Sequence, residues 1–226
     1  MTILICCDRD GTINDDQDFY LGKQPDWKEH VTILPGVVEG IRKLNAIPGS
    51  EFFIVTNQPG VSVIGSGLEH LTEARVDDVN QYIINELRKD SLTISGAFIC
   101  PYASREYIEK TKSRGWEYNP EYIQENPRDM KPNIGMIEKA ANSLGKKLAY
   151  INEVYVIGDR TSDVLAGLNA GGKGVWVPSL KAIKTNQENA VEKLKQAYPE
   201  RVYLAQDFIN AAEWIVKDAA RLQGAT

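Results

Sequence analysis

Two aspartates near the start of the chain, Asp8 and Asp10, are the residues whose type and spacing most clearly suggest chemistry. They follow the apolar run Ile3–Cys7, which is too short for a helix and predicts a buried strand. Residues i and i+2 of an extended segment point the same way, so both carboxylates can face one ligand, while Gly11 lets the backbone turn away beneath it. The pair therefore predicts a site where one carboxylate attacks and the other carries a proton.

Two simpler explanations of the Asp-x-Asp-Gly motif have to be weighed. Aspartates often end strands merely as turn formers, and for an isolated motif that explanation is the better one. A calcium loop of the EF-hand type requires its glycine at position 6, whereas here the glycine is fourth and an apolar strand precedes the motif. The calcium loop is excluded by this spacing, and the turn-former explanation is weakened by the rest of the chain.

Polar groups follow two further predicted strands. The strand Phe52–Val55 ends in Thr56 and Asn57, and the strand Val154–Ile157 ends in Gly158-Asp159 with Asp163 four residues beyond Asp159. Strands and helical segments alternate, which predicts an α/β fold with a doubly wound parallel sheet and helices on both faces. The remaining predicted strands are 97–100 and 174–177 with a short strand near 202–204, and the predicted helices are 37–44, 68–88, 134–144, 161–167, 190–196 and 208–221.

The chain of 226 residues is interpreted as one domain, 1–226. The tract 101–130 carries many aromatic and charged residues with little periodicity, so we predict that it leaves the core as an excursion that selects the substrate. The net charge of −5 argues against non-specific nucleic-acid binding, so no nucleic-acid partner is expected. No segment reaches transmembrane length and the N-terminus has no basic leader, so the expectation is a cytoplasmic protein with no membrane partner.

The ordered set of motifs resembles the haloacid dehalogenase (HAD) superfamily of phosphotransferases. The set comprises Asp8 with Asp10, Thr56 with Asn57, a lysine just before a helix, Lys131, and Asp159 with Asp163. The runs Asp8-Arg9-Asp10-Gly11-Thr12, Thr56-Asn57-Gln58-Pro59-Gly60 and Gly158-Asp159-Arg160 are similar to the branch of heptose-bisphosphate and histidinol-phosphate phosphatases. The resemblance implies a Rossmann-like HAD core with a small loop insertion in place of a full cap domain.

The resemblance also implies an activity, the hydrolysis of a small phosphorylated metabolite such as a sugar (bis)phosphate or histidinol phosphate. Asp8 would be the nucleophile that forms an aspartyl phosphate, and Asp10 would be the general acid and base. Mg²⁺ would be held by Asp8, the main-chain carbonyl of Asp10 and Asp159, with Asp163 close by or as a further ligand. Thr56, Asn57 and Lys131 would bind the phosphoryl oxygens.

Each of these residues also has a simpler explanation. Thr56 and Asn57 could form a turn or helix cap, Asp159 could cap the following helix, and a lone Lys131 is most often a solvated surface lysine. The acidic group Asp15, Asp16 and Asp18 is expected to be a solvated flap rather than part of a site.

Two departures from the branch affect the substrate. Its zinc loop needs cysteines and histidines, whereas here Cys100 stands alone in that region, so a zinc site is not expected. Met130 stands where the branch has an arginine, and Arg128 is the candidate substitute for binding substrate. The tract also offers Arg105 and Arg114 for a second anion and Trp116, Tyr118 and Tyr122 for stacking.

A second class of function remains open, a non-catalytic or receiver-like phosphate-binding signalling module. Receivers also use an acceptor aspartate, but they are about half this long, and Asp10 beside Asp8 favours turnover. A P-loop at Gly167 to Lys173 fails because Gly174 replaces the required Ser or Thr. The sequence leaves the oligomeric state open, with a monomer as the default expectation.

Overall fold

The computed structural model describes residues 1–16 and 20–224 and has a central sheet of six parallel strands in the order β10-β9-β8-β1-β2-β4. The predicted doubly wound parallel sheet is therefore confirmed. Strand β1 lies between β2 and β8, so the three strand ends that carry the candidate residues are neighbours. The six strands are β1 (Ile3–Cys7), β2 (Ser50–Asn57), β4 (Gly96–Cys100), β8 (Glu153–Gly158), β9 (Lys173–Trp176) and β10 (Val202–Leu204).

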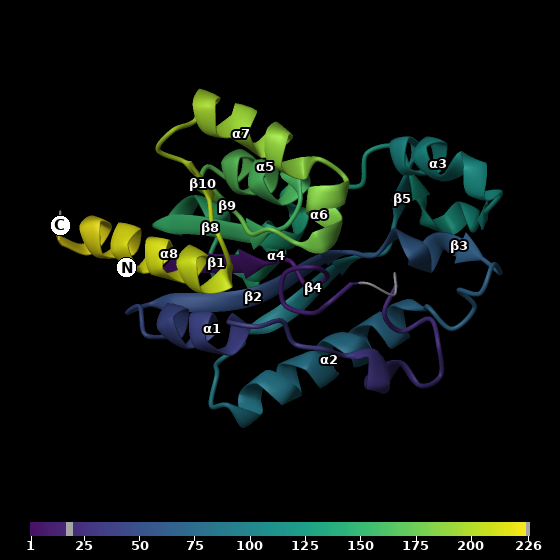
Figure 1. Ribbon diagram of the computed structural model, residues 1–226, viewed down its shortest axis with the longest axis horizontal. Coiled ribbons are helices and arrows are strands. Elements are labelled where there is room, and N and C mark those ends of the chain that lie inside the picture. The colour runs from purple at the N-terminus through teal and green to yellow at the C-terminus, as the bar shows by residue number, and fades with distance from the viewer. Residues whose placement is uncertain (17–19, 225–226) are drawn as a thin grey trace.

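Helices cover both faces of this sheet (Figure 1). Helices α1, α2 and α8 pack on one face, α4 and α5 pack on the other, and α7 lies outside α5. This arrangement explains why the central strands read as continuous apolar runs, since both of their faces are buried. The helices are α1 (Val37–Asn45), α2 (Glu73–Lys89), α3 (Arg105–Thr111), α4 (Gly135–Ser143), α5 (Thr161–Asn169), α6 (Leu180–Lys184), α7 (Gln187–Ala197) and α8 (Phe208–Gly224).

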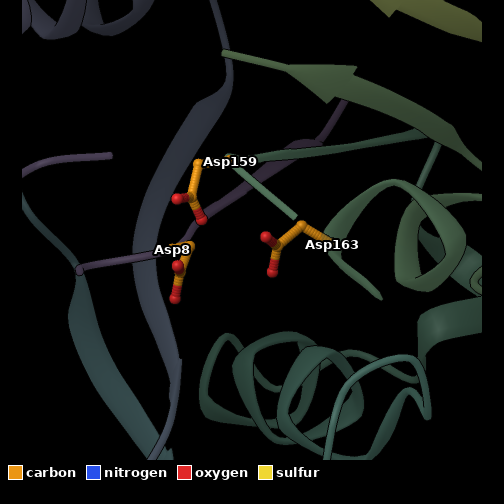
Figure 2. A group of neighbouring side chains, drawn as sticks. All are labelled: Asp8, Asp159 and Asp163. Carbon is orange, nitrogen blue, oxygen red and sulfur yellow. The ribbon is translucent and has the colours of Figure 1, made fainter. Parts of the chain in front are cut away.

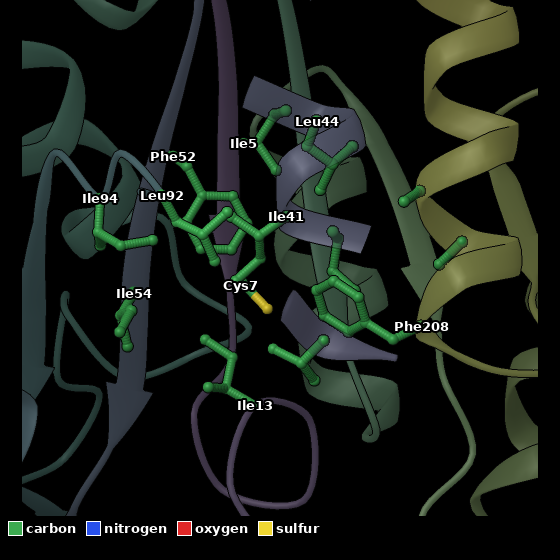
Figure 3. Packing of buried hydrophobic residues seen from close by; sticks show 14 of the residues in the cluster. Ile5, Cys7, Ile13, Ile41, Leu44, Phe52, Ile54, Leu92, Ile94 and Phe208 are labelled. Carbon is green, nitrogen blue, oxygen red and sulfur yellow. The ribbon is translucent and has the colours of Figure 1, made fainter. Parts of the chain in front are cut away.

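Strand β1 divides its side chains between two hydrophobic layers. Ile5 and Cys7 pack with Ile41 and Phe208 on the face of α1 and α8 (Figure 3), and Leu4 and Cys6 pack on the face of α4. Alternate residues of a strand point to opposite faces, so one short strand contributes to both layers. Burial of each such aliphatic side chain contributes about 1.5–3 kcal/mol. The strand that presents Asp8 is thus anchored from both sides.

Helix α2 begins five residues later than the predicted start at Leu68. The side chain of Thr72 accepts a hydrogen bond from Arg75 N at 3.1 Å and caps the helix at Glu73. Leu68 and Leu71 are buried before the helix, in a cluster with Val63. Apolar spacing cannot distinguish such a buried turn from a first helical turn.

The tract 101–130 contains short elements that periodicity did not reveal. It forms α3 and pairs two strands of two residues each, β5 (Ala103–Ser104) and β7 (Ile123–Gln124). A third, β6 (Glu117–Tyr118), pairs with β3 (Val63–Ile64) outside the tract. These elements lie beyond one end of the central sheet, and the N-terminus and the last turn of α8 lie at the opposite end (Figure 1).

Both ends of the tract are fixed to the end of β2. Gln58 N donates to Cys100 O at 2.7 Å, and Asn57 hydrogen-bonds the main chain of Lys131.

Within the described residues, no helix has the length and apolarity required to cross a membrane.

Candidate active site

The ends of β1 and β8 bring three carboxylates together at the edge of the sheet. Asp8, Asp159 and Asp163 each offer an oxygen within 4.8 Å of the others (Figure 2), and all three residues are buried. Asp8 follows β1, Asp159 follows β8, and Asp163 lies in the first turn of α5. The loop after β1 approaches so closely that a Cβ on Gly11, whose φ is +82°, would lie 2.6 Å from Asp159 Oδ2.

The pKa values of this cluster reflect first its burial and then its excess of negative charge. Burial, opposed by Lys131 and reinforced by Asp163, raises the pKa of Asp8 to about 8. Burial and then Asp163 raise the pKa of Asp159 to about 6, against the attraction of Arg160. The buried Oδ1 of Asp159 has no hydrogen-bond partner among the described residues, and the nearest cation, Arg160 Nε, is 3.6 Å away. Buried carboxylate oxygens with raised pKa values fit a hard divalent cation.

Helix α5 is not capped by Asp159, the possibility raised from the sequence. Arg160 is the residue at the helix start, and Asp163 Oδ2 accepts its N–H at 2.9 Å. Asp159 is instead held by Ser179, whose hydroxyl donates to Oδ2 at 2.5 Å. Its other oxygen remains available to a ligand.

Asp10 lies outside the three-carboxylate cluster and has a different environment. Arg9, which is fully buried, donates two hydrogen bonds to it at 2.9 and 2.8 Å, and Gln58 donates a third at 2.7 Å. Burial alone would raise the pKa of Asp10, but the charge and hydrogen bonds of Arg9, together with Gln58, hold it below its usual value. Arg9 also donates to Asn80 Oδ1 on α2 at 2.9 Å, which fixes the guanidinium.

Lys131 is a buried lysine rather than a solvated one. Its ammonium lies 2.7 Å from Asp8 Oδ1 and 2.6 Å from Asp163 Oδ1, and it donates to Val55 O at 2.9 Å. Burial alone would lower the pKa of Lys131, but Asp163 and Asp8 outweigh that effect and hold the pKa above its usual value. The lysine therefore stays charged beside Asp8.

The residues after β2 support both Lys131 and Asp10. The side chain of Asn57 donates to Lys131 O at 3.1 Å and accepts from Lys131 N at 3.0 Å. Thr56 is buried, and its hydroxyl accepts from Gln58 Nε2 at 2.8 Å, so Gln58 bridges Thr56 and Asp10. The structure thus brings seven of the eight predicted site residues to one place.

The exception is Arg128. Its side chain is 79% exposed and pairs with Glu138 on α4 at 2.6 Å, and it is not among the residues that line the cavity. The structure does not bring Arg128 to the site.

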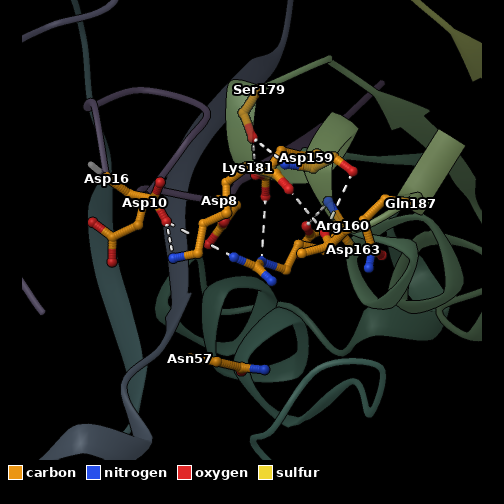
Figure 4. Close-up of polar contacts among 12 residues, drawn as sticks. Asp8, Asp10, Asp16, Asn57, Asp159, Arg160, Asp163, Ser179, Lys181 and Gln187 are labelled. Atoms are coloured by element: carbon orange, nitrogen blue, oxygen red, sulfur yellow. Dashed lines mark hydrogen bonds and ion pairs between the residues drawn. The ribbon is translucent and has the colours of Figure 1, made fainter. Parts of the chain in front are cut away.

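A cavity of about 470 Å³ opens above the carboxylates, and sequence reasoning missed several of its residues. Asp16, expected on a solvated flap, is largely buried in the cavity wall, where its carboxylate meets Lys181 at 2.6 Å and Arg160 at 3.8 Å (Figure 4). Asp15 also lines the cavity, and Asp18 lies outside the described residues. These contacts join segments far apart in the sequence, which no local pattern signals. The lining includes Asp8, Asp10, Asp15, Asp16, Tyr20, Leu21, Glu29, His30, Thr32, Thr56, Asn57, Gln58, Pro59, Tyr107, Lys131, Arg160, Ser162, Asp163 and Lys181.

The chain is similar in sequence to known hydrolases and phosphatases. A model of the HAD-hydrolase-like family matches residues 130–204. A D-glycero-beta-D-manno-heptose-1,7-bisphosphate 7-phosphatase of Neisseria meningitidis serogroup A is 24% identical over 220 residues, covering 97% of this chain and 98% of the relative. A protein of the same name from Helicobacter pylori is 27% identical over 179 residues, covering 79% of this chain and 84% of the relative.

Among solved structures, the fold is similar to that of D,D-heptose 1,7-bisphosphate phosphatase from B. bronchiseptica in complex with magnesium and phosphate. The TM-score is 0.65 at 24% identity, and the match covers 96% of this chain and 99% of the other. The resemblance stated from the motifs is confirmed, as is the expectation of an enzyme rather than a signalling module. Its fold, its ordered motifs and these matches together make the chain similar to phosphatases of the HAD-like superfamily.

Proposed function

We propose that the chain is a Mg²⁺-dependent phosphomonoester hydrolase that acts on a small phosphorylated metabolite through an aspartyl phosphate. The observation that carries this proposal is the contrast between Asp8 and Asp10. Asp8 lies among buried carboxylates beside a lysine, whereas Asp10 is held apart by Arg9 and Gln58. Two carboxylates in such different environments suit two different roles.

In the first half-reaction, a carboxylate oxygen of Asp8 attacks phosphorus and the bond from phosphorus to the ester oxygen breaks. Asp10 gives its proton to the departing alkoxide, which leaves as the alcohol. In the second half-reaction, water attacks phosphorus, Asp10 takes a proton from that water, and the bond to Asp8 breaks to release phosphate. The lowered pKa of Asp10 in the substrate-free protein favours the ionised form that acts as the base in this second half-reaction, so a proton has to enter the site with the substrate before the first.

The remaining groups would bind charge that builds on the phosphoryl oxygens. Lys131 and Thr56 are the side chains proposed to hold these oxygens, and Asn57 positions Lys131 through its main chain. Asp8 and Asp159 would hold Mg²⁺, with Asp163 as a further ligand and the Asp10 carbonyl completing the protein's share. When bound, the ion neutralises part of the charge of the carboxylates and of the phosphate.

The substrate and the domain organisation are part of the same proposal. Relatives named as heptose-bisphosphate phosphatases support a phosphorylated sugar, and an amino-alcohol phosphate such as histidinol phosphate is retained beside it. We treat residues 1–226 as one domain, in which the tract 101–130 helps to select the substrate. From that tract Tyr107 reaches the cavity, where its hydroxyl hydrogen-bonds that of Tyr20.

A cytoplasmic location is also part of the proposal. It is supported by the three buried free cysteines, since thiols stay reduced in the cytoplasm.

The test is phosphate release from a panel of phosphorylated metabolites by the wild-type protein, with Mg²⁺ and with EDTA. We expect release that requires the metal and is abolished in Asp8→Asn. Acid-quenched wild-type enzyme should carry one phosphoryl group on the peptide that contains Asp8, detected by mass spectrometry. Metal-independent release, or wild-type release from Asp8→Asn, would contradict the mechanism.

A further inference from the structure

We infer that the preferred substrate is a phosphate monoester whose alcohol carries no second phosphate, and that Asp16 enforces this choice. The inference rests on the proposed hydrolase function of the same cavity. The phosphoryl group is bound at Asp8 and Lys131, so the alcohol must occupy the rest of the cavity. The charges of that remaining wall decide which alcohols fit.

The cations of the cavity already have carboxylate partners. Lys131 lies between Asp8 and Asp163, where the transferred phosphoryl group binds. The other two, Arg160 and Lys181, converge on the carboxylate of Asp16, at 3.8 and 2.6 Å. The side chain of Asp16 is 11% exposed, so this carboxylate occupies the place where a second phosphate would meet two positive groups.

The cavity also has a surplus of negative charge. Its described lining contains six carboxylates and three lysine or arginine cations. One divalent ion does not remove this surplus, and the transferred phosphate then adds to it. A second phosphate would therefore be repelled by the carboxylates of the cavity and by the transferred phosphate. Repulsion between like charges in a partly desolvated site amounts to several kcal/mol.

The tract 101–130 adds no cation to the described lining. Arg105 is exposed and lies 4.0 Å from Glu125, and Arg128 pairs with Glu138. The guanidinium of Arg114 lies 4.5 Å from the ring centre of Trp116 and hydrogen-bonds Tyr20 of the cavity wall, without itself being among the described lining residues. None of these arginines, predicted from the sequence to bind a second anion, lines the cavity. The residue that the tract does contribute is Tyr107.

The remaining residues of the cavity wall therefore suit an alcohol that is neutral or positively charged. Tyr20 and Tyr107 line the cavity with hydroxyls that hydrogen-bond each other, and Glu29 offers a carboxylate that accepts hydrogen bonds from hydroxyl or amino groups. Polyols and amino alcohols have this chemistry. A sugar bisphosphate would have to displace Asp16 from Arg160 and Lys181 before its second phosphate could bind.

The experiment compares kcat/KM for matched substrates at saturating Mg²⁺, such as glucose 6-phosphate against glucose 1,6-bisphosphate and fructose 6-phosphate against fructose 1,6-bisphosphate. The wild type should favour each monophosphate. Asp16→Asn, which keeps the side-chain shape and removes the carboxylate that faces Lys181 and Arg160, should move the ratio toward the bisphosphate by at least about tenfold. Glu29→Gln is the matched control, because it removes one charge from the wall at a residue with no described contact to either cation.

Equal or better use of bisphosphates by the wild type would overturn the inference, as would a ratio that moves no further in Asp16→Asn than in Glu29→Gln. Asp16→Ser provides the same comparison if the asparagine variant does not fold. Failure of the proposed function has a different signature, since no ester in the panel, p-nitrophenyl phosphate included, would then be hydrolysed. In that case titration calorimetry of the Mg²⁺-loaded protein with the same matched pairs measures the selection by binding.

Discussion

Replacing Asp8 and replacing Asp10 by asparagine should change the stability of the metal-free protein in opposite directions. Both substitutions preserve side-chain shape, and both residues belong to the proposed catalytic pair. Asp8 is a buried carboxylate whose pKa is raised from 3.8 to about 8, so the folded state disfavours its charge. Asp10 has a lowered pKa because Arg9 and Gln58 favour its charge.

The magnitude for Asp8 follows from proton linkage. Each unit of pKa shift corresponds to about 1.4 kcal/mol, so a lone carboxyl with this shift, which stays mostly protonated in the fold at pH 7.5, would lower the free energy of unfolding by about 5 kcal/mol. Asp8, Asp159 and Asp163 titrate as a coupled group around Lys131, so part of this cost remains when Asp8 is replaced. We therefore expect the free energy of unfolding of Asp8→Asn to exceed that of the wild type by about 2 kcal/mol. That gain corresponds to a melting temperature roughly 4–8 °C higher for a chain of this size.

The gain should depend on pH in a defined direction. A carboxyl whose folded pKa lies above its unfolded value binds more protons when folded, so the wild type loses stability as pH rises from about 4 to about 8. The asparagine side chain does not titrate, so the advantage of Asp8→Asn should be small at pH 5 and largest at pH 8. Asp10→Asn instead leaves the fully buried Arg9 without its carboxylate and should cost about 3 kcal/mol.

The assay is thermal or urea unfolding of the three proteins in EDTA at pH 5, 6.5 and 8, followed by circular dichroism. Mg²⁺ should then stabilise the wild type more than Asp8→Asn at pH 8, because the ion replaces the missing positive charge. If Asp8→Asn is destabilised in EDTA at pH 8, or if its difference from the wild type does not change with pH, the account of the carboxylate cluster is wrong.

Three further predictions concern the residues around this cluster. Lys131→Met should lower kcat by at least about a hundredfold in phosphate-release assays and reduce urea stability more at pH 8 than at pH 5, because Asp8 and Asp163 lose the ammonium between them; equal kcat would remove the lysine from the mechanism. Asn57→Ala should cost about 1–3 kcal/mol in urea unfolding and lower kcat, since both main-chain hydrogen bonds to Lys131 are lost. Gly158→Ala would place a Cβ 2.2 Å from Asp163 Cγ and should weaken Mg²⁺ binding in titration calorimetry; unchanged affinity would show that Asp163 can shift without consequence.

The sequence predicted the parts of the site that depend on strand ends. Asp8, Thr56 and Asp159 each follow a buried strand, and parallel strands place their carboxyl ends at one edge of the sheet. The buried state of Lys131 was not predictable from its own surroundings, because it depends on Asp8, Asp163 and Val55 O, which are far away in the sequence.

Contacts between distant polar residues account for the rest of what the sequence could not show. Arg9 follows Asp8 directly, and its burial depends on Asn80, which lies 71 residues away. Asp16 meets Lys181 across 165 residues, so its burial in the cavity wall leaves no periodic signal. Arg128 has a nearby alternative in Glu138 on α4, and that ion pair is found in place of a contact with the cavity.

The anchoring of the tract 101–130 at the end of β2 has a consequence for how this enzyme can diversify. Asn57 and Gln58 hold the two ends of the tract, at Lys131 and Cys100, next to each other. A segment with fixed, adjacent ends behaves as a closed loop, and doubling the length of such a loop costs only about 0.6 kcal/mol in closure entropy. Insertions and deletions within it are therefore cheap, while the lysine at its exit keeps its place. If the tract helps to select the substrate, as proposed, changes in its length or sequence can alter specificity while the strand ends that carry Asp8 and Asp159 stay unchanged.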